Sequence, residues 1–368
     1  MIPVGVFLLK GSVASPQLCE RRKQCSGTLP SIGLEKVPIT CYYLDSAMEM
    51  PENELIKRIK KFGKRSSKII RGIGDDGAVV EMSQGSYVFV QDAIVEHIHF
   101  EFEFMDAYDI GKKAVYVNVS DVLSMGAEPL YFLVTIGIPD CISYKDIDRL
   151  YRGMMQAAKE FSVVLIGGDT SETKSDFFID VSMVGKLITK SYLGRDNAKT
   201  GDLIGVTGYL GESAYGLFLL KNKKRGKGLS KFIQRYTHPK PPYDLWKELI
   251  KNKIPNAMMD ISDGLLIDLE RMMSESQRGA KIFLERLPIP RGIIKEKQEM
   301  FALSGGEDYQ FLFTFSRDKL ETIQKIYKKG FLVSAIGEVM KGKGVKLFKN
   351  GKEKKLNYKG YEHFRGSP

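Results

Sequence analysis

The sequence predicts an α+β fold made of two α/β domains. Its 368 residues exceed the span of about 100 to 200 residues that is typical of one domain. Short apolar runs rich in β-branched residues mix with amphipathic helical stretches, and a polar loop over residues 194–201 separates two such series. We therefore expect an N-terminal domain with a mixed sheet over residues 48–190 and a C-terminal α/β domain over residues 191–368.

The first 47 residues are expected to lie outside this fold, as a disordered leader or an artefact of the start site. They show no sustained helical or strand period, are rich in Ser, Gly, Pro and Cys, and precede an internal Met48 or Met50. Over residues 52–62, apolar side chains recur at helical spacing among lysines. This pattern predicts an amphipathic helix as the first folded element.

In the first domain, β-rich apolar runs predict five strands, over residues 87–95, 115–119, 130–138, 163–166 and 178–187. Between the third and the fourth of these runs, an apolar stripe over residues 147–158 predicts a helix. In the second domain, similar runs predict strands near residues 203–207, 257–261, 281–284, 310–315 and 333–339. Helices are expected there near residues 212–220 and 265–273.

The composition is that of an ordinary globular protein, with 43% hydrophobic and 27% charged residues. The longest apolar runs are far shorter than the roughly 20 residues of a membrane helix, so no membrane partner is expected. Of the net charge of +11, residues 341–368 supply +7, and no recognition motif accompanies this basic tail, so no nucleic-acid partner is expected either. The four cysteines form no C-x-x-C pair, and residues 2–9 lack the basic start of a secretory signal, so we expect a cytoplasmic protein.

Aspartates recur beside Gly or Ser at the ends of apolar runs. Taken singly, each such cluster is explained by helix capping and turns. Taken together, several carboxylates in one cleft would repel one another unless cations neutralised them, and oxygen ligands of this kind select hard ions such as Mg²⁺. The clusters are Gly72–Gly77, Gln91–Asp92, Asn118–Asp121, Gly167–Thr170, Asp260–Gly264 and Ser304–Asp308.

The segment from Gly72 to Gly77 matches G-x-G-x-x-G, yet a dinucleotide site is not predicted there. That motif offers backbone N–H groups to pyrophosphate, whereas here Asp75 and Asp76 occupy the approach and the chain continues as a strand. A phosphate bridged by Mg²⁺ would be accepted. No P-loop and no protein-kinase motif occurs. The pair His97 and His99 is at strand spacing and is an alternative metal couple, although only two other histidines could complete it.

The ordered motifs GIGDDGAV, VNVSDVLSMGAEP, LIGGDTSE, GDLIGVTGYLGESAYGL, MDISDGLLIDL and ALSGGEDYQF resemble the thiamine-monophosphate kinase family, from about Ile70 to Phe364. This family belongs to the superfamily of aminoimidazole ribonucleotide synthetase, selenophosphate synthetase and HypE. The resemblance implies N-terminal domains that pair into a β-barrel in a homodimer, with ATP bound near that interface. It also implies transfer of the γ-phosphoryl group of ATP to thiamine monophosphate with several Mg²⁺ ions.

The resemblance implies roles for individual residues. Metal ligands would be Asp76, Asp92, Asp121, Asp169, Asp260 and Asp263, with Asp75 as a neighbouring contributor. ATP contacts would come from Gly168, Asp169, Arg195, Ser262 and Tyr151. Thiamine phosphate contacts would come from His99, Glu307 and Tyr361, which suit a phosphate, an aminopyrimidine and an aromatic or cationic ring in turn. No side chain is assigned covalent chemistry, so catalysis would be electrostatic, by direct in-line transfer.

The sequence departs from the family pattern at one place, because Val90-Gln91-Asp92-Ala93 stands where hydroxyl ligands are usual. One metal is therefore expected to bind differently there. The alternatives are another synthetase of the superfamily, of the selenophosphate or aminoimidazole ribonucleotide type, and a basic nucleic-acid binding protein. Selenophosphate synthetase requires a reactive cysteine or selenocysteine near its N-terminus and HypE a cysteine at its C-terminus, and neither is matched within the resembling region.

Overall fold

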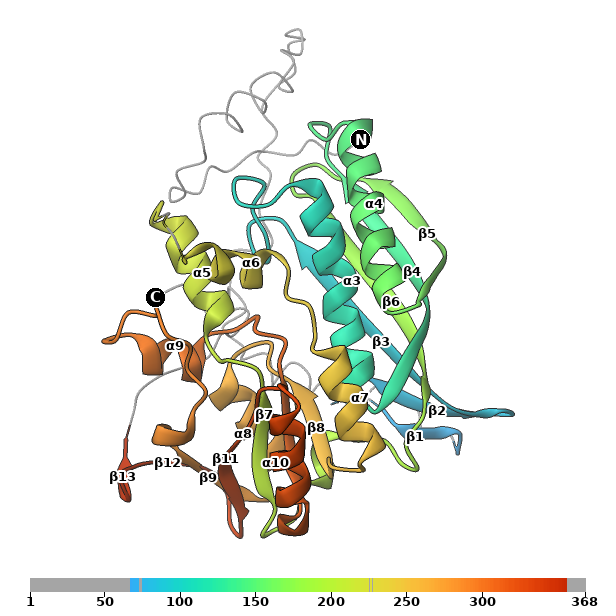
Figure 1. Ribbon diagram of the computed structural model, residues 1–368. Helices are drawn as coiled ribbons and strands as arrows, with labels where there is room; N and C mark the ends of the chain where they lie inside the picture. The colour runs from blue at the N-terminus through green and yellow to red at the C-terminus, as the bar shows by residue number, and fades with distance from the viewer. Residues whose placement is uncertain (1–66, 73–74, 225, 227, 356–368) are drawn as a thin grey trace, which may run out of the picture.

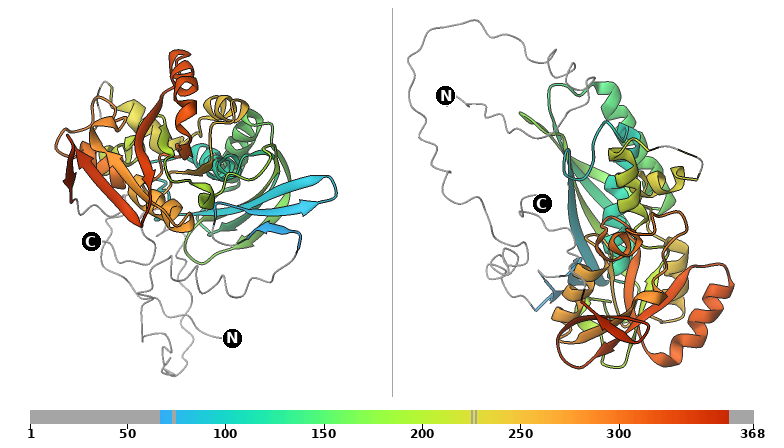
Figure 2. Two further views of the ribbon diagram at one scale, coloured as in Figure 1. Left: turned by 90° about the horizontal axis from the view of Figure 1, so that it is seen from below. Right: turned by 90° about the vertical axis from the view of Figure 1, so that its left-hand side faces the viewer.

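The computed structural model describes residues 67–72, 75–224, 226 and 228–355 (Figure 1). The leader expected over residues 1–47, the helix expected over residues 52–62 and the side chain of Tyr361 lie outside these residues. Two mixed sheets with helices packed on them confirm the α+β class (Figures 1 and 2). Among the helices of the described part, none is both long enough and apolar enough to cross a membrane.

The first sheet has six strands in the order β1-β2-β3-β6-β4-β5. Their bounds are Ile69–Arg71, Ala78–Met82, Gly85–Val95, Ala127–Ile138, Val164–Glu172 and Phe178–Leu187 for β1 to β6 in chain order. Only β4 and β5 pair in parallel. Helices α3 (Ala107–Ser124) and α4 (Tyr144–Glu160) cover one face of this sheet (Figures 1 and 2).

The opposite face of the first sheet carries exposed apolar side chains. They are Phe89, Tyr131, Leu133, Val164 and Ile166, which are 36% to 59% exposed. On the covered face, residues of the same sheet such as Val90, Val134 and Val181 are at most 5% exposed. Among the described residues no helix packs on this face, so it is the uncovered face of the sheet (Figures 1 and 2).

The second sheet has seven strands in the order β13-β12-β9-β11-β7-β10-β8. In chain order β7 to β13 span Leu203–Thr207, Ala257–Asp260, Gly279–Phe283, Phe311–Phe315, Val333–Met340, Gly344–Lys349 and Lys352–Lys354. The helices α5 to α10 span Glu212–Lys221, Ser230–Thr237, Tyr243–Lys251, Leu265–Glu275, Gln298–Ser304 and Leu320–Lys328. Short 3₁₀ turns lie at Arg195–Asn197, Leu284–Arg286 and Arg317–Lys319. Helices α7 and α10 pack on one face of the sheet and α8 on the other.

The strand predicted over residues 115–119 is wrong, because these residues lie inside α3. Fourteen of the eighteen residues of α3 are buried, so apolar side chains occupy nearly every face and the helical period disappears from the sequence. A buried run of valines then resembles a strand. Every other strand predicted from the sequence is present, and so are the helices predicted near residues 147–158, 212–220 and 265–273.

Two glycines allow α3 and α4 to cross at backbone contact. A Cβ atom on Gly111 would lie 2.1 Å from the carbonyl oxygen of Leu150, and one on Gly153 would lie 1.9 Å from that of Tyr108. Both distances are far below a van der Waals contact. The crossing therefore requires glycine on each helix, and it sets how close α4 comes to α3.

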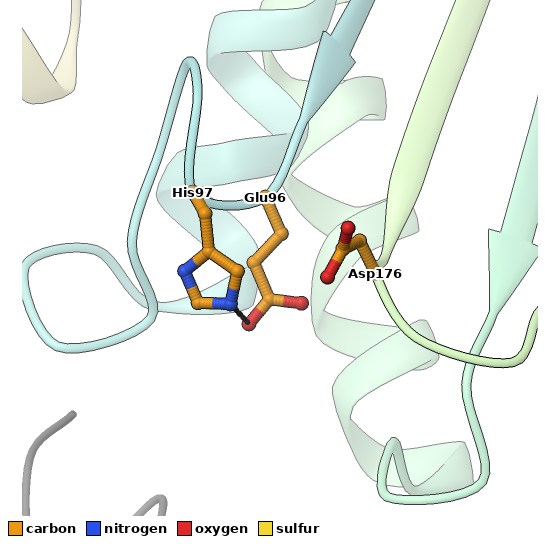
Figure 3. A group of neighbouring side chains, drawn as sticks. All are labelled: Glu96, His97 and Asp176. Carbon is orange, nitrogen blue, oxygen red and sulfur yellow. Dashed lines mark ion pairs between the residues drawn. The ribbon is translucent and has the colours of Figure 1, made fainter. Parts of the chain in front are cut away.

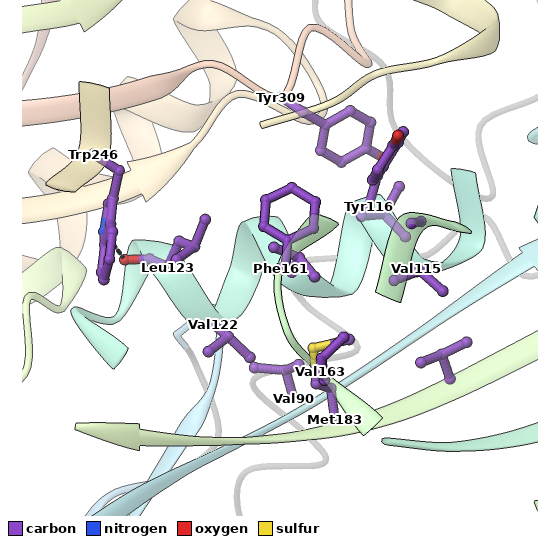
Figure 4. Close-up of a cluster of buried hydrophobic side chains, with 14 of the residues drawn as sticks. Val90, Val115, Tyr116, Val122, Leu123, Phe161, Val163, Met183, Trp246 and Tyr309 are labelled. Carbon is purple, nitrogen blue, oxygen red and sulfur yellow. Dashed lines mark hydrogen bonds between the residues drawn. The ribbon is translucent and has the colours of Figure 1, made fainter. Parts of the chain in front are cut away.

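One hydrophobic core runs through both domains. Trp246 of α7 is fully buried, stacks on Tyr243 at 5.6 Å between ring centroids, and donates from Nε1 to the carbonyl oxygen of Leu123 in α3 at 2.8 Å (Figure 4). The acceptor belongs to the last turn of α3, and it also accepts the backbone N–H of Gly126 at 2.9 Å. The bond from Trp246 joins the C-terminal domain to the helix that spans the first domain.

Replacing Trp246 with phenylalanine is expected to lower the free energy of unfolding by about 1 to 3 kcal/mol, because the carbonyl oxygen of Leu123 loses one of its two donors and the smaller ring leaves buried space unfilled. Urea unfolding followed by far-UV circular dichroism measures this, since Trp246 is the only tryptophan. Tyr327→Phe, at a side chain that is 58% exposed, is the control and should change stability by less than about 0.5 kcal/mol. Equal stability of the two variants would contradict a role for this bond.

Candidate active site

Three aspartates from distant parts of the chain meet at the boundary between the domains. Oxygens of Asp76, Asp121 and Asp260 all lie within 4.8 Å of one another. Asp76 belongs to the loop before β2, Asp121 to the last turn of α3, and Asp260 to the end of β8. The structure thus brings together three of the predicted metal ligands.

Local structure explains why these side chains converge. Along β8, side chains alternate between faces, so Asp260 shares the face of Met258, which packs into the core that contains α3. From α3, Ser120 donates to Asp260 Oδ2 at 2.7 Å. Asp121 lies in the last turn of α3, where the helix dipole disfavours an anion and the turn itself contains no basic residue.

The electrostatics of the three-aspartate cluster favour a bound cation. Burial is the main cause that raises the pKa of Asp121 well above 3.8, and the carboxylates of Asp260 and Asp76 raise it further. Burial and Asp76 likewise raise the pKa of Asp260, against the hydrogen bond from Ser120. The Oδ2 atom of Asp76 is buried without a hydrogen-bond partner among the described residues. A cation of two positive charges would satisfy this oxygen and offset the repulsion.

Two further aspartates extend the cluster towards the C-terminal domain. Asp92 of β3 has its pKa raised to about 7, chiefly by burial, with Asp263, Asp180 and Glu307 adding repulsion. Asp263 lies in the turn between β8 and α8, where it pairs with Arg271. Ser262, predicted to contact ATP, precedes it in the same turn.

The turn that carries Ser262 and Asp263 is held by Asp268, a residue that the sequence reading missed. One oxygen of Asp268 accepts the backbone N–H groups of Ser262, Asp263 and Gly264, each at 3.1 Å. Burial raises the pKa of Asp268 to about 7, and Asp263 adds to it, whereas Arg271 lowers it. Asp268 lies six residues after Ser262 in the first turn of α8, and this position was the sequence signal for its role.

Arg195, also predicted to contact ATP, lies against the acidic loop before β2. Its guanidinium pairs with Asp76 and approaches Asp75, and its backbone N–H donates to Asp75 as well. Arg71 binds the other side of Asp75 at 2.8 Å and reaches Asp196 and Glu275 at 3.1 Å each. Burial and Asp76 raise the pKa of Asp75 to about 6, and the two arginines oppose this. The pairs fix the loop that presents Asp76.

The two described residues predicted to bind the thiamine compound meet at one lysine. Lys113 Nζ donates to the carbonyl oxygen of His99 at 2.7 Å and lies 2.7 Å from Glu307 Oε1. The sequence reading missed Lys113, because it lies in the helix whose core was taken for a strand. In a helix, residues 113, 120 and 121 share one face, so the correct period would have grouped Lys113 with Ser120 and Asp121.

Tyr309 is a second residue that the sequence reading missed. It is 6% exposed, and burial raises its pKa well above 10, with Glu307, Asp92, Asp260 and Asp121 as further causes. Tyr309 therefore lies near Glu307 and near the aspartates of the cluster. Tyr309 directly follows the Gly-Gly-Glu-Asp motif, and this neighbourhood was the only indication in the sequence that it belongs to the site.

The structure does not bring Gly168 and Asp169 to the three-aspartate cluster. Both lie inside the exposed part of β5, not beyond a strand end as the sequence suggested. Asp169 and Asp180 both pair with Thr135 of β4, so their side chains share the uncovered face of the sheet. Gln91 lies on that face too and donates to Asp180 at 2.6 Å, whereas Asp92 points to the covered face. The described residues of this chain therefore provide no contact between Asp169 and the three-aspartate cluster.

Tyr151 is also placed apart from the acidic residues. It lies half-buried on α4 and packs against the core. Burial alone raises its pKa, with no carboxylate among the causes, in contrast to Tyr309. Its contact with a nucleotide therefore stays a prediction.

The alternative metal couple of His97 and His99 does not form as a pair. His97 lies with Glu96 and Asp176, whose ligand atoms are all within 4.8 Å (Figure 3). Its Nδ1 is 2.8 Å from Glu101, and Glu96 accepts the N–H of Phe177, so these side chains already have partners in the chain. His99 instead accepts the N–H of Val95 at its own Nδ1 and turns back to the strand end.

Comparison with known proteins gives consistent matches along the chain. Two family models match in succession: AIR synthase related protein, N-terminal domain, over residues 74–187, and AIR synthase related protein, C-terminal domain, over residues 199–350. The thiamine-monophosphate kinase of Buchnera aphidicola subsp. Acyrthosiphon pisum is 36% identical over 329 residues, covering 86% of this chain and 100% of that protein. The thiamine-monophosphate kinase of Bacillus subtilis is 32% identical over 328 residues, again covering 86% of this chain and 100% of the relative.

A solved structure described as AaThiL complexed with AMPPCP and TMP matches the fold with a TM-score of 0.74 and 33% sequence identity. The match covers 86% of this chain and 97% of the other. The family models, the full-length relatives and this structure agree with the resemblance found in the motifs. The chain belongs to the thiamine-monophosphate kinase family.

Proposed function

We propose that the protein transfers the γ-phosphoryl group of ATP to thiamine monophosphate, which yields thiamine diphosphate and ADP. The observation that carries the proposal is the buried cluster of Asp76, Asp121 and Asp260, with an unsatisfied oxygen on Asp76. Full-length relatives named thiamine-monophosphate kinase and a similar structure that holds AMPPCP and TMP support the same reaction.

The donor set suits Mg²⁺, because it consists of carboxylate oxygens without sulfur or imidazole. Asp76, Asp121 and Asp260 would hold ions of this kind, and Asp92 and Asp263, which act electrostatically on one another beside this cluster, are proposed as further ligands. When bound, Mg²⁺ would neutralise the triphosphate and the surrounding carboxylates. Asp169 would act as a metal ligand in a site that groups from outside this chain complete.

The residues of the chain supply position and charge. The acceptor is a phosphate oxygen that is already ionised at neutral pH, so in-line transfer needs no strong general base and no phosphoenzyme. Arg195 holds the Asp76 loop and is proposed to reach the nucleotide together with Ser262, Gly168 and Tyr151. His99, Glu307 and Tyr361 are proposed to hold the thiamine compound.

A homodimer is also part of the proposal. The uncovered face of the first sheet carries apolar side chains on β3, β4 and β5 together with Asp169 and Asp180. Pairing two such faces would bury the apolar residues and would bring a second chain close to Asp169. We also propose that the two domains divide between residues 190 and 191, which lie between the two sheets. The proposed location is the cytoplasm, where ATP is available.

ADP formation tests the function directly. The full chain is incubated with ATP and MgCl₂, with and without thiamine monophosphate, and ADP and thiamine diphosphate are quantified by chromatography. We expect ADP to appear in step with thiamine diphosphate and only when the acceptor is present. Unphosphorylated thiamine serves as the control acceptor and should give no turnover. ADP release that ignores the thiamine compound would favour an unrelated ATPase.

The pKa shifts predict how pH and Mg²⁺ affect stability. Asp92 has a pKa of about 7 in the folded chain, and those of Asp121 and Asp260 are also raised, whereas an unfolded aspartate has 3.8. The folded state therefore binds more protons over this window, so the free energy of unfolding falls as pH rises from about 4 towards 7. In EDTA we expect a lower melting temperature at about pH 8 than at about pH 5.5.

Adding MgCl₂ should raise the melting temperature more at the higher pH, because ionised carboxylates bind the cation and protonated ones do not. Scanning calorimetry of the full chain measures both effects. NaCl at the same ionic strength is the control, since general screening would act equally with either salt. An equal shift from NaCl would argue against a divalent site.

A further inference from the structure

Lys113 is a charged side chain with no access to solvent. It lies in the second turn of α3, and its side chain is 0% exposed. A buried ammonium group is strongly disfavoured unless partners in the protein compensate for the lost water. Its presence at this depth therefore calls for a specific set of contacts.

The ammonium group of Lys113 contacts two oxygen acceptors and one aromatic ring. Nζ donates to the carbonyl oxygen of His99 at 2.7 Å, pairs with Glu307 Oε1 at 2.7 Å, and lies 4.5 Å from the ring centroid of Tyr236. An ammonium group has three donors and no acceptor. Two of these donors have oxygen partners and the side chain is 0% exposed, so a bound molecule does not reach Nζ and Lys113 acts through the groups that it contacts.

These partners come from three separate segments. His99 lies in the loop between β3 and α3, Tyr236 in α6, and Glu307 in the loop between α9 and β10. The first segment belongs to the first domain and the other two belong to the second. Lys113 thus joins the two domains at the end of the site where the thiamine compound is proposed to bind.

The backbone at Glu307 is held by contacts that do not involve Lys113, whereas the carboxylate of Glu307 is held by Lys113. Glu307 has a positive φ of 64° and its N–H donates to the carbonyl oxygen of Ser262 at 2.7 Å, which ties the loop to the turn that carries Asp263. The carboxylate of Glu307 is 23% exposed, and Lys113 is the cation that pairs with it among the described residues. Without Lys113 the backbone would stay and the carboxylate would lose its direction.

We propose that Lys113 is a positioning residue for the acceptor substrate: it orients the Glu307 carboxylate and the His99 loop so that thiamine monophosphate binds at one place relative to the metal cluster. This inference rests on the proposed function. It assigns to Lys113 the affinity for the acceptor and not the affinity for ATP, because its contacts reach Glu307 and His99 and not the loop of Asp76.

Lys113→Met removes the charge and keeps most of the side-chain volume. We expect kcat/KM for thiamine monophosphate to fall by about 100-fold, mostly through KM, since a displaced binding group has effects of this size. KM for ATP should stay within about threefold of the wild type. Lys112→Met is the matched control on the same helix, because Lys112 pairs with Glu160 at 3.6 Å and does not contact Glu307 or His99.

The double variant Lys113→Met/Glu307→Gln separates positioning from a purely structural role. Glu307→Gln alone should weaken acceptor binding. If Lys113 acts through Glu307, adding Lys113→Met to that variant should change KM for the acceptor by less than about threefold. Should Lys113→Met alone fail to fold because an unpaired carboxylate is left buried, the comparison of the double variant with Glu307→Gln still gives the answer.

The outcomes are distinct. Equal losses of affinity for ATP and for thiamine monophosphate, or effects of the two substitutions that multiply, would overturn the positioning role. Wild-type turnover with a Lys113→Met variant that behaves as Lys112→Met would overturn this inference and leave the proposed function standing. A wild-type chain that forms no ADP in response to thiamine monophosphate would overturn both.

Discussion

Asp121→Asn is expected to lower kcat by about 1,000-fold, with the fold intact. The substitution keeps the shape of the side chain but removes one negative charge from a cluster whose oxygens lie within 4.8 Å of one another. It also places an N–H₂ group where a cation would lie. Because the charged form of Asp121 is disfavoured by burial, the metal-free variant should be at least as stable as the wild type.

Steady-state kinetics at saturating MgCl₂ and calorimetry in EDTA measure the two effects of Asp121→Asn. Asp244→Asn is the matched control, since Asp244 lies on α7 with its side chain 79% exposed and pairs only with Lys247 among the described residues. That variant should retain the kcat of the wild type. Near-normal turnover of Asp121→Asn at saturating MgCl₂ would remove Asp121 from the metal site.

Gly153→Ala is expected to destabilise the protein by about 3 kcal/mol, although alanine is the better helix former by about 1 kcal/mol. The new Cβ would lie 1.9 Å from the carbonyl oxygen of Tyr108, a backbone atom that cannot turn away. Helices α3 and α4 would have to separate. Since α3 also carries Asp121, activity should fall along with stability.

Urea unfolding compares Gly153→Ala with Gly226→Ala. At Gly226 an added Cβ would approach only the side chain of Leu229, at 3.6 Å, so this control should change stability by less than about 0.5 kcal/mol. If Gly153→Ala were as stable as the control, the close crossing of α3 and α4 would not hold in solution.

Much of the fold could be predicted, because most of the strands consist of short runs rich in β-branched residues that are bounded by turns. The strands that form the centres of both sheets and the amphipathic helix α4 were of this kind. Helix α3 could not be recognised, because burial on nearly all sides removes the polar face from which a helical period is read. The helices α6, α7, α9 and α10 are short and depend on tertiary packing, which α7 and α10 find on the second sheet and α6 and α9 on α5.

The candidate site was predicted in part for the same reasons. Recurrent aspartates near Gly and Ser pointed to Asp76, Asp121 and Asp260, which do converge. The sequence could not show that Asp169 faces the uncovered side of its sheet, because the side that a strand residue faces depends on register with β4 and β6. Nor could it show Lys113, whose meaning comes only from partners in two other segments.

The buried helix α3 has a consequence for what the site can accept. Lys113 and Asp121 are eight positions apart on it, which at 1.5 Å per residue is a separation of about 12 Å along the axis. A helix packed on nearly every side keeps this separation fixed between the end where the thiamine compound is proposed to bind and the aspartates. A molecule whose phosphate lies nearer to its ring, or farther from it, than this separation allows would contact one end of α3 and not the other.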